Sequence, residues 1–460
     1  MQSNPLPNCR FFKPLLIKHK KTQMKRILFY CGFMAVASTA VAQQKVAYTE
    51  YKLKNGLPVI LHQDKSAPVV AVSVMYHVGS KDEVSNRTGF AHFFEHLLFE
   101  GSKNIGRGEF MKIVSANGGQ NNANTTQDRT FYYEVFPSNQ LATGLWLESE
   151  RMFQPVINQI GVKTQNEVVK EEKRLRVDNS PYGNFVSSIM KRLFTKHQYN
   201  WVPIGSMADL DAATLEEFQA FNKKYYTPSN SVLVIAGDID IEKTKKLVDA
   251  YFSEIPSGTP IVKTKIQEDP ITKAIIDTAY DNNIQLPAIM TAYRIPGMTT
   301  KDAKALDMAS AVLSRGSSSR MYKKMVDDKK TALQTGTFNF SLEDYGAYIS
   351  YALPNNDTPL DSLLKDMDEE IVKLQNNPIS AEEFTKLQNQ FENDNLDKNT
   401  RMLGVAENLA DGYTFHKNTN NINEELEAIR KITAADIQAV AKKYLNPNQR
   451  VILYYLPNKK

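Results

Sequence analysis

The pattern of apolar and polar positions in the middle of the chain recurs at its C-terminal end. Residues 214–235 and 433–454 match at a constant offset of 219 residues, with threonine, Gln-Ala, Lys-Lys-Tyr, proline and an apolar run in register. Each copy predicts a helix that begins after a capping threonine, a turn at the proline and a buried strand. A weaker match links residues 71–76 to residues 288–293. The sequence therefore predicts an α+β fold with two homologous halves, each a mixed sheet packed against helices.

The two halves meet in a stretch that is rich in proline, serine and charge, residues 253–275. This composition is typical of a linker between domains. We therefore place a boundary inside the stretch, between an N-terminal domain of residues 43–260 and a homologous C-terminal domain of residues 261–460.

The N-terminal end of the chain has the pattern of an export signal. Residues 1–23 form an upstream segment without a fold pattern, so that translation could start at Met1 or Met24. Residues 24–42 contain a basic start, an apolar run and an Ala-x-Ala site, which predicts a cleaved signal peptide. The apolar run, residues 27–41, is shorter than the ~20 residues that span a bilayer. We expect an exported protein, periplasmic or extracellular, without a stable membrane span in the mature chain; a lipid anchor is less favoured.

Removal of the leader changes the charge and the cysteine content. Residues 1–42 hold seven of the 56 Lys and Arg residues and no acid, which leaves 49 basic against 51 acidic residues, a net charge of −2 instead of +5. Nothing then indicates nucleic-acid binding. Cys9 and Cys31 are both removed, so that a metal site in the mature chain has to use histidine and carboxylate ligands.

The most specific chemical signal is the inverted zinc-hydrolase motif His92-Phe-Phe-Glu95-His96. On an α-helix, residues four apart lie one above the other, with about 5–6 Å between their Cβ atoms. His92 and His96 can therefore bind one ion, while Glu95 can reach a water on that ion as general base. The plainer interpretation is an amphipathic helix with two hydrogen-bonded histidines, since seven histidines in 460 residues can fall four apart by chance.

The second half lacks this motif. The offset of the weaker match carries the three motif positions onto Ala309, Val312 and Leu313, in a predicted helix over residues 303–313. None of these residue types binds a metal, so that only the first half is expected to carry the chemistry.

Catalytic zinc generally has three protein ligands and one open position, so the two histidines need a partner. The segment 164–176 is predicted to be helical and offers Glu167, Glu171 and Glu172. Spacing alone does not choose among the three. The segment could also be a solvated charged helix with ion pairs between residues four apart.

The motif, the segment Val168–Glu172 and the duplicated half together resemble the family of zinc proteases that contains pitrilysin, insulin-degrading enzyme and mitochondrial processing peptidase, in its small bacterial form. The resemblance implies that the third ligand is a glutamate 76 residues after the second histidine, which is Glu172 here. It implies one Zn²⁺ per chain. Gln165 departs from the family, where a glutamate is common seven residues before this ligand.

The resemblance also implies the activity: a zinc metalloendopeptidase that degrades short or unfolded peptides by metal-activated water, with Glu95 as the base. The stretch 118–133 predicts a turn, a polar edge strand and an inner strand. In the resembling enzymes, the equivalent of Asn122 and Ala123 pairs with the substrate main chain, which is β-strand addition.

One expected element is missing from the second half. Active single-chain relatives place an arginine and a tyrosine there, and alignment puts Val326 and Leu333 at those positions. The resemblance implies a heterodimer in which a homologous helper subunit supplies the Arg and Tyr, unless Arg315, Arg320 or Tyr322 substitutes. The alternative function is a non-catalytic or helper subunit, a peptide-binding scaffold of a processing-peptidase-like complex. The sequence does not identify the substrate or the oligomeric state.

Overall fold

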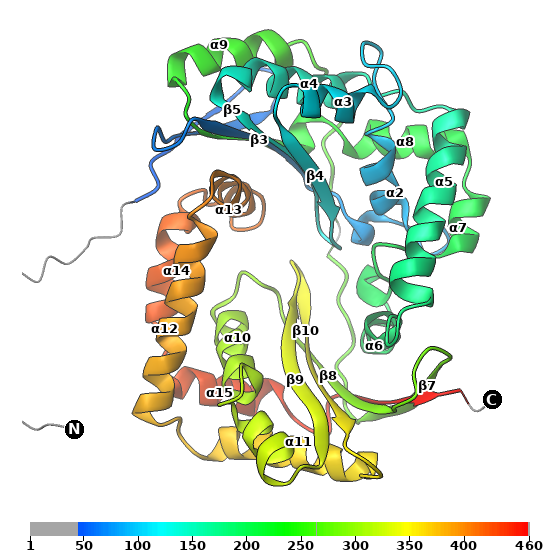
Figure 1. Cartoon of the computed structure of the whole chain (residues 1–460), viewed down its shortest axis with the longest axis vertical. Coiled ribbons are helices and arrows are strands. Elements are labelled where there is room, and N and C mark those ends of the chain that lie inside the picture. Colours follow the sequence, from blue (N-terminus) through cyan, green and yellow to red (C-terminus); the bar gives the residue numbers. More distant parts are fainter. Residues whose placement is uncertain (1–44, 264, 459–460) are drawn as a thin grey trace, which may run out of the picture. The chain divides into compact units, whose positions relative to one another are not determined.

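Two mixed β-sheets with helices packed on them form the fold in the computed structural model (Figure 1). The structure describes residues 45–263 and 265–458. The predicted upstream segment 1–23 and the predicted signal peptide 24–42 lie outside the described residues. No helix in the described ranges combines the length and the apolar character needed to cross a membrane. The α+β prediction with two mixed sheets is confirmed.

The first sheet has six strands in the order β1-β2-β6-β3-β5-β4. Its strands β6 and β3 are nearly uninterrupted apolar runs, and every residue of β6 is buried, as expected for inner strands with both faces covered. The edge strand β4 has the polar sequence QNNANT and pairs only with β5 among the described strands. The strands are β1 (Thr49–Lys52), β2 (Pro58–Gln63), β3 (Val69–Tyr76), β4 (Gln120–Thr125), β5 (Thr130–Pro137) and β6 (Ser231–Gly237).

The second sheet has five strands in the order β7-β11-β8-β10-β9. Its strand β11 pairs in parallel with β7 and antiparallel with β8, just as β6 pairs in parallel with β2 and antiparallel with β3 in the first sheet. The strands are β7 (Ile275–Asp281), β8 (Ala288–Pro296), β9 (Ala332–Ser341), β10 (Tyr345–Pro354) and β11 (Val451–Pro457).

One helix packs in the same way on each sheet. On the first sheet, α4 packs on β3 and β5; on the second, its counterpart α11 packs on β8 and β10. The helices are α2 (Phe90–Leu97), α3 (Glu109–Ala116), α4 (Leu141–Phe153), α5 (Gln159–Lys173), α6 (Phe185–Leu193), α7 (Met207–Ala212), α8 (Leu215–Tyr225), α9 (Ile241–Phe252), α10 (Lys301–Ser314), α11 (Leu360–Asn376), α12 (Ala381–Lys398), α13 (Met402–Thr414), α14 (Asn421–Arg430) and α15 (Ala434–Tyr444).

The predicted repeat is present in the order of the elements. Thr214 caps α8 and Thr433 caps α15, and each forms a capping box with the acid at the third helical position. The strand that follows is β6 in the first half and β11 in the second. By the same order, α2 corresponds to α10, α5 to α12, α6 to α13 and α7 to α14.

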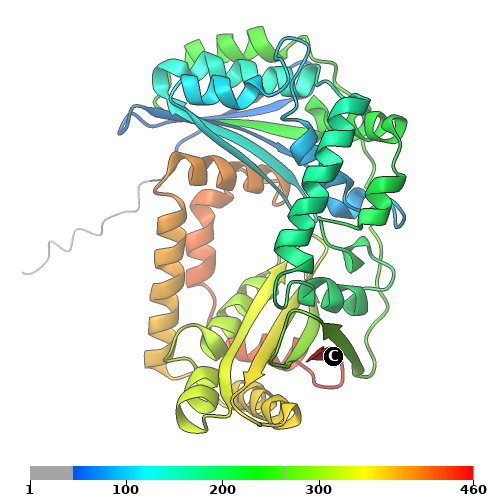
Figure 2. The same ribbon diagram turned by 45° about the vertical axis from the view of Figure 1, so that its right-hand side comes forward.

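One helix from each half crosses to the sheet of the other half (Figure 1 and Figure 2). Helix α6 of the first half packs Ile189 and Leu193 against apolar residues of β8, β10 and β11. Helix α13 of the second half packs Val405 and Leu409 against apolar residues of β2, β3 and β6. Each half therefore completes the hydrophobic core of the other.

The chain passes from the first sheet to the second through residues 253–274, which contain no helix or strand at their described positions. The boundary predicted between residues 260 and 261 falls inside this stretch. The division into two domains at that point stays a prediction, because α6 and α13 each pack on the sheet of the opposite half.

A buried ionic cluster also joins the halves, where the turn between β9 and β10 meets the first sheet. Lys81 Nζ lies 2.8 Å from Asp128 Oδ1 and also contacts the Glu343 carboxylate. Glu343 Oε2 accepts a hydrogen bond from His77 Nε2 at 2.8 Å, and the Glu343 main-chain N–H donates to Asp128 Oδ2 at 2.9 Å. Burial alone would raise the pKa of Glu343, but the hydrogen bond from His77 and the charge of Lys81 bring this pKa well below its usual value.

Replacing Glu343 with glutamine should lower the free energy of unfolding at pH 7, because Lys81 and His77 lose a charged acceptor. The Glu343 side chain is 23% exposed, so we expect a loss of about 2 kcal/mol, less than the ~3–5 kcal/mol of a fully buried pair. A carboxylate with a lowered folded pKa stabilises the fold above its unfolded pKa of 4.5 and loses this effect as the pH falls. The difference between variant and wild type should therefore shrink below pH 4.5.

Urea unfolding of the mature chain at several pH values measures this difference. Glu254→Gln is the matched control, because Glu254 is exposed in the stretch between the sheets and its loss should leave the midpoint unchanged. Equal midpoints for Glu343→Gln and wild type at pH 7 would show that the cluster adds no stability.

Candidate metal centre

Helix α2, which carries the motif, starts at a glycine whose main chain is bound by a buried carboxylate. Gly89 has a φ of 94°, in the left-handed region that favours glycine. Glu83 Oε2 accepts a hydrogen bond from the Gly89 N–H at 2.9 Å, and Oε1 accepts one from the Ala91 N–H at 2.8 Å. These N–H groups have no partner inside the helix, and the Glu83 oxygens satisfy them. Burial raises the pKa of Glu83 well above its usual value, although the two hydrogen bonds oppose this shift. Glu83, which sequence reasoning missed, therefore fixes where the motif helix begins.

Aromatic packing fixes how α2 is rotated about its axis. Phe90 and Phe93 both stack on Phe218 of α8, each with 4.6 Å between ring centroids. Because these phenylalanines occupy the buried face, the two histidines are left on a face that is only partly buried. The His92 and His96 rings lie 4.9 Å apart, close enough to bind one ion together.

Helix α5 brings one glutamate to these histidines. Glu172 Oε2 lies 3.1 Å from His96 Nε2 and 3.7 Å from His92 Nε2. One ligand atom from each of the three residues lies within 4.8 Å of the others. The structure thus brings together the three residues predicted to be metal ligands.

The other two glutamates on α5 point elsewhere. Glu167 is 65% exposed and pairs with Lys170, and Glu171 is 56% exposed and pairs with Arg174. Both side chains therefore fit the alternative interpretation of this segment, a solvated charged helix with ion pairs on its surface. Of the three glutamates that spacing left open, only Glu172 faces the histidines, because a helix turns neighbouring residues about 100° apart.

The three side chains fit a tetrahedral zinc site with one open position. Zinc bonds histidine nitrogen and carboxylate oxygen at about 2.0–2.2 Å, which places ligand atoms of a tetrahedron about 3.4 Å apart. The distances of 3.1 and 3.7 Å lie on either side of this value. Within residues 45–263 and 265–458, these three form the one group of His, Cys, Asp or Glu side chains close enough to hold a metal ion.

The electrostatic environment favours the protonation states that bind a metal. Burial, assisted by the neighbouring His96, lowers the pKa of His92 to about 4, so its ring is neutral at pH 7. The hydrogen bond from His96 lowers the pKa of Glu172, which keeps this side chain a carboxylate. Neutral imidazole and ionised carboxylate are the forms that act as ligands.

Glu95 lies beside this group and is oriented by the edge strand. Thr125, the last residue of β4, donates a hydrogen bond from Oγ1 to Glu95 Oε2 at 2.6 Å. Burial raises the pKa of Glu95, although the Thr125 hydrogen bond opposes this shift. Sequence reasoning missed Thr125, because its contact with Glu95 depends on how β4 packs against α2.

Strand β4 has main-chain groups available for a further strand. In an antiparallel pair, hydrogen-bonded and non-hydrogen-bonded residues alternate. The turn bond from the Thr126 N–H to the Arg129 carbonyl sets this alternation, so the main-chain groups of Asn121, Ala123 and Thr125 point away from β5. The Ala123 N–H is bonded to the Asn122 side-chain oxygen at 2.9 Å. The two residues predicted to bind substrate therefore lie on an open sheet edge.

Replacing Ala123 with proline should weaken peptide binding without removing zinc. Proline deletes the outward N–H of this residue, while its pairing with β5 does not use that group. The substrate would lose the hydrogen bond from this N–H, and the substrate carbonyl that accepts it would be left without a partner. We therefore expect a kcat/KM about 10-fold to 100-fold lower, mainly through a higher KM. Steady-state kinetics on a quenched peptide and zinc analysis measure the two effects.

The control for this variant is Ala123→Ser, which changes the side chain but keeps the N–H. It should retain a KM close to that of the wild type. If Ala123→Pro also kept a normal KM, pairing of substrate with this edge would be wrong.

Gln165, where the resembling family has a glutamate, supports the site from a distance. Its Nε2 donates to Glu100 Oε1 at 2.6 Å, and Glu100 also pairs with Arg107. A glutamate at this position would place two carboxylates together. The glutamine therefore gives a neutral link between α5 and the end of the motif segment.

The second half offers no cation to the metal centre from the positions considered in the sequence. Val326 is partly buried against the second core, and Leu333 is 52% exposed on β9. Arg315 donates to Asp394 from Nη1 and Nη2, and Arg320 donates to Glu383 from Nε and Nη2. These arginines hold α12 in place and are committed to carboxylates.

Comparison with known proteins identifies relatives along most of the chain. The sequence profile described as Insulinase (Peptidase family M16) matches residues 58–199, and the profile described as Peptidase M16 inactive domain matches residues 212–391. The zinc protease PqqE of Helicobacter pylori is 29% identical over 448 residues, which cover 95% of this chain and 100% of that protein.

Solved structures show the same fold. The crystal structure of a protease from Helicobacter pylori matches with a TM-score of 0.85 and 29% identity, over 90% of this chain and 100% of that chain. The first half of the periplasmic protease PqqL from Escherichia coli matches with a TM-score of 0.73 and 18% identity, over 90% of this chain and 93% of that chain.

The two profiles follow one another along the chain, and the second begins inside the first half, at residue 212. The first profile contains the His92, His96 and Glu172 positions, and the second covers most of the half in which the motif is replaced. A relative called a zinc protease aligns along its entire length. The chain belongs to peptidase family M16, the insulinase family.

Proposed function

We propose that this protein is a zinc-dependent endopeptidase that hydrolyses short or unfolded peptides. The observation that supports this most is the convergence of His92, His96 and Glu172 on one point, with Glu95 beside them and an open strand edge next to Glu95. In a hydrolytic metal site, an adjacent oriented carboxylate can act as the general base. The similarity to a named zinc protease supports the same conclusion.

His92, His96 and Glu172 would hold one Zn²⁺ per chain. Zinc with three such ligands acts as a Lewis acid and lowers the pKa of water to about 7. Because Thr125 occupies Oε2 of Glu95, Oε1 is the oxygen that accepts the proton of the attacking water. The raised pKa of Glu95 makes it a stronger base than an exposed glutamate, and Glu95 then returns the proton to the leaving amine.

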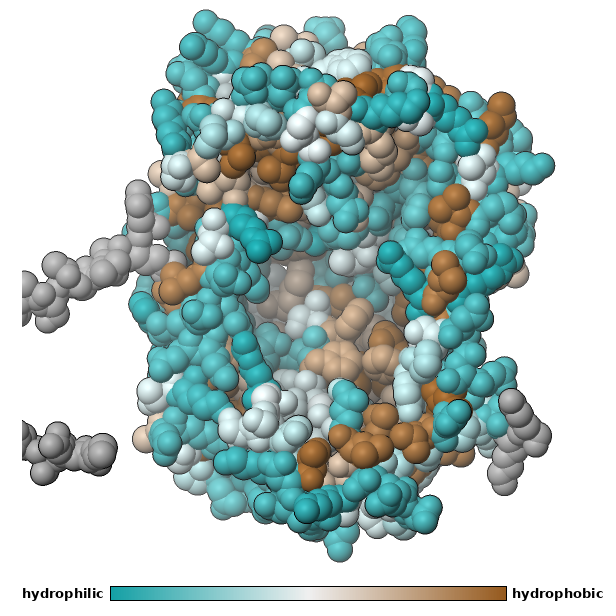
Figure 3. Space-filling view, in the orientation of Figure 1, coloured by the Kyte–Doolittle hydropathy of each residue, from teal (hydrophilic) through white to brown (hydrophobic). Residues whose placement is uncertain are grey.

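The substrate would bind as an additional strand on β4, through the outward main-chain groups next to Asn122 and Ala123. Main-chain pairing gives affinity without demanding a particular sequence. It also requires an extended segment, which folded proteins seldom present. Figure 3 shows the described chain hollowed between the two sheets on the face in view.

We further propose that a homologous helper subunit supplies the missing arginine and tyrosine. A donor aimed at the developing oxyanion contributes about 3–4 kcal/mol to transition-state stabilisation. Arg315 and Arg320 already pair with carboxylates in the second half, so they are not free to take this role. The complex would be a heterodimer of one zinc-bearing and one helper chain.

The test is zinc analysis and hydrolysis of a quenched peptide by residues 43–460, alone and with a homologous chain that carries the Arg and Tyr. We expect one zinc per chain and hydrolysis at least ~100-fold faster in the mixture. Full activity of the lone chain would refute the helper subunit. Zinc without hydrolysis in either sample would support the alternative, a non-catalytic peptide-binding scaffold, which the missing Arg and Tyr favour.

We also propose that the chain is exported and acts on peptides in the periplasm or outside the cell. The support is the leader pattern in residues 24–42 and the similarity to PqqL, which is named a periplasmic protease. Mass spectrometry of the exported protein should find Gln43 at the N-terminus. A mature chain that retains residues 27–41 would refute cleavage.

A further inference from the structure

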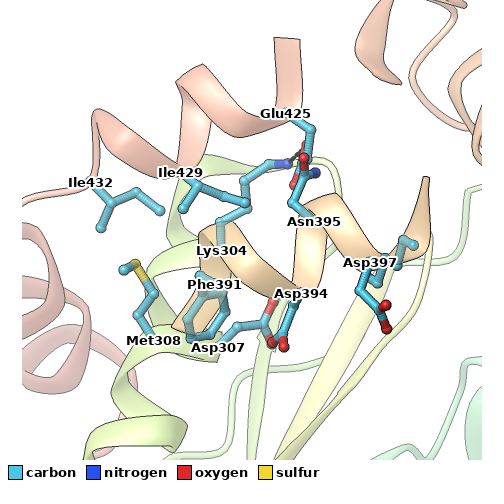
Figure 4. A pocket seen from close by; sticks show the side chains of 11 residues that line it. Lys304, Asp307, Met308, Phe391, Asp394, Asn395, Asp397, Glu425, Ile429 and Ile432 are labelled. Carbon is cyan, nitrogen blue, oxygen red and sulfur yellow. Dashed lines mark hydrogen bonds and ion pairs between the residues drawn. The ribbon is translucent and has the colours of Figure 1, made fainter. Parts of the chain in front are cut away.

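The second half contains a cavity of about 330 Å³ (Figure 4). It lies between α10 and α12, the counterparts of α2 and α5, and α14 contributes a further wall. The positions on α10 that correspond to the motif, Ala309, Val312 and Leu313, do not line this cavity. It is therefore a different site from the metal centre of the first half.

Part of the lining is apolar. Figure 4 shows Met308 and Phe391 on one side and Ile429 and Ile432 on another. A cavity of this size is at the lower end of the range for small-molecule sites, about 300–1,000 Å³. The apolar walls suit a short aliphatic chain.

The polar part of the lining has hydrogen-bond acceptors without partners. Asp307 Oδ1 accepts a hydrogen bond from Asn339 at 2.7 Å, while Oδ2 has no hydrogen-bond partner among the described residues. Asn395 is 8% exposed, and its side-chain oxygen is buried without a hydrogen-bond partner in the described part of the chain. Burial raises the pKa of Asp307 to about 6, so this side chain is an incompletely solvated carboxylate at pH 7.

Four carboxylates and two lysines line the cavity. The charges of Lys304 and Lys398 oppose the rise in the pKa of Asp307, but neither lysine forms an ion pair with Asp307 in the described part of the chain. Lys304 pairs with Glu425 at one edge, as Figure 4 shows. Arg315 pairs with Asp394 at 2.6 Å and points its charge at that carboxylate. Neither the Asp307 carboxylate nor the Asn395 oxygen receives an ion pair or hydrogen bond from these groups. A ligand that matches the cavity therefore brings several N–H donors and a positive charge.

We propose that this cavity binds a small organic cation, with an ammonium or guanidinium head and an aliphatic body of about amino-acid size. The head donates to Asp307 and Asn395, and the body packs against Phe391 and Ile429. The cation can be a free amine or the side chain of a lysine or arginine in a peptide. This site is separate from the proposed peptidase centre, so that either proposal can fail without the other.

Calorimetric titration of the mature chain with agmatine, a guanidinium and an ammonium joined by a four-carbon chain, tests whether the cation is a free small molecule. A capped Ala-Arg-Ala peptide tests whether the cation is a peptide side chain. The same peptide with norleucine in place of arginine is its uncharged control. We expect saturable binding of agmatine, of the arginine peptide or of both. The Asp307→Asn variant should bind about tenfold more weakly or worse. Glu382→Gln, which removes an exposed charge from the same helix α12 outside the cavity, should bind normally.

Two results would overturn the proposal. The first is that neither agmatine nor the arginine peptide binds saturably, and the second is that the Asp307→Asn and Glu382→Gln variants bind the ligand with equal affinity. Binding of agmatine alone assigns a free amine, and binding of the arginine peptide alone assigns a peptide side chain. If Asp307→Asn does not fold, Ile429→Trp fills the cavity without changing its charge and should abolish binding. Unchanged binding by that variant would equally overturn the proposal.

Discussion

Replacing Glu95 with glutamine is expected to reduce peptide hydrolysis by about 10²–10⁴-fold and to leave the zinc content unchanged. The amide keeps the size of the side chain and can still contact Thr125, but it cannot accept the proton of the attacking water. Glu95 is not one of the three side chains that meet around the metal position, so the zinc ligands stay intact. The measurements are kcat on a quenched peptide, with the helper chain present, and elemental analysis.

Glu109→Gln is the matched control for this substitution, because Glu109 is an exposed glutamate in the first turn of α3. Its variant should have wild-type kcat. Retained turnover in Glu95→Gln would remove Glu95 from the role of general base, and loss of zinc would assign it to the metal instead.

The second large effect is expected for Glu172→Gln, which should lower zinc affinity by more than about 100-fold. Loss of groups that only support a zinc ligand already costs 10–100-fold, and Glu172 is itself placed as a ligand. Its carboxylate oxygen lies 3.1 Å from His96 and 3.7 Å from His92, so that its replacement by an amide removes a negative charge from the metal position itself. Competition with a fluorescent chelator measures the affinity, and hydrolysis should fall in parallel.

The neighbouring glutamates provide sharp controls. Glu167→Gln and Glu171→Gln remove the same charge from the same helix, but these side chains pair with Lys170 and Arg174 at the surface. Both variants should bind zinc as the wild type does. If Glu171→Gln lost zinc and Glu172→Gln did not, the ligand assignment would be wrong.

Much of this arrangement could be predicted from the sequence, because it depends on short-range patterns. The capping threonines Thr214 and Thr433 and the apolar runs behind them define the repeat. The four-residue spacing of His92 and His96 places both rings on one helix face, as found. The polar strand at residues 120–125 lies at a sheet edge, also as predicted.

Other parts of the site depend on contacts between distant elements. Spacing could not choose Glu172 over Glu171, since the choice depends on how α5 is rotated against α2. Glu83 and Thr125 gave no signal, because a single acid or threonine outside a motif is common. Each acquires its role only when a turn or a strand is packed against the motif helix.

The exchange of α6 and α13 between the halves has a consequence for biosynthesis. All strands of the first sheet have been translated by residue 237, but the helix that seals one of its apolar faces spans residues 402–414. The nascent chain therefore carries an uncovered hydrophobic surface until α13 has been translated. The first sheet can reach its native packing only then, so that premature termination upstream of α13 yields an aggregation-prone product.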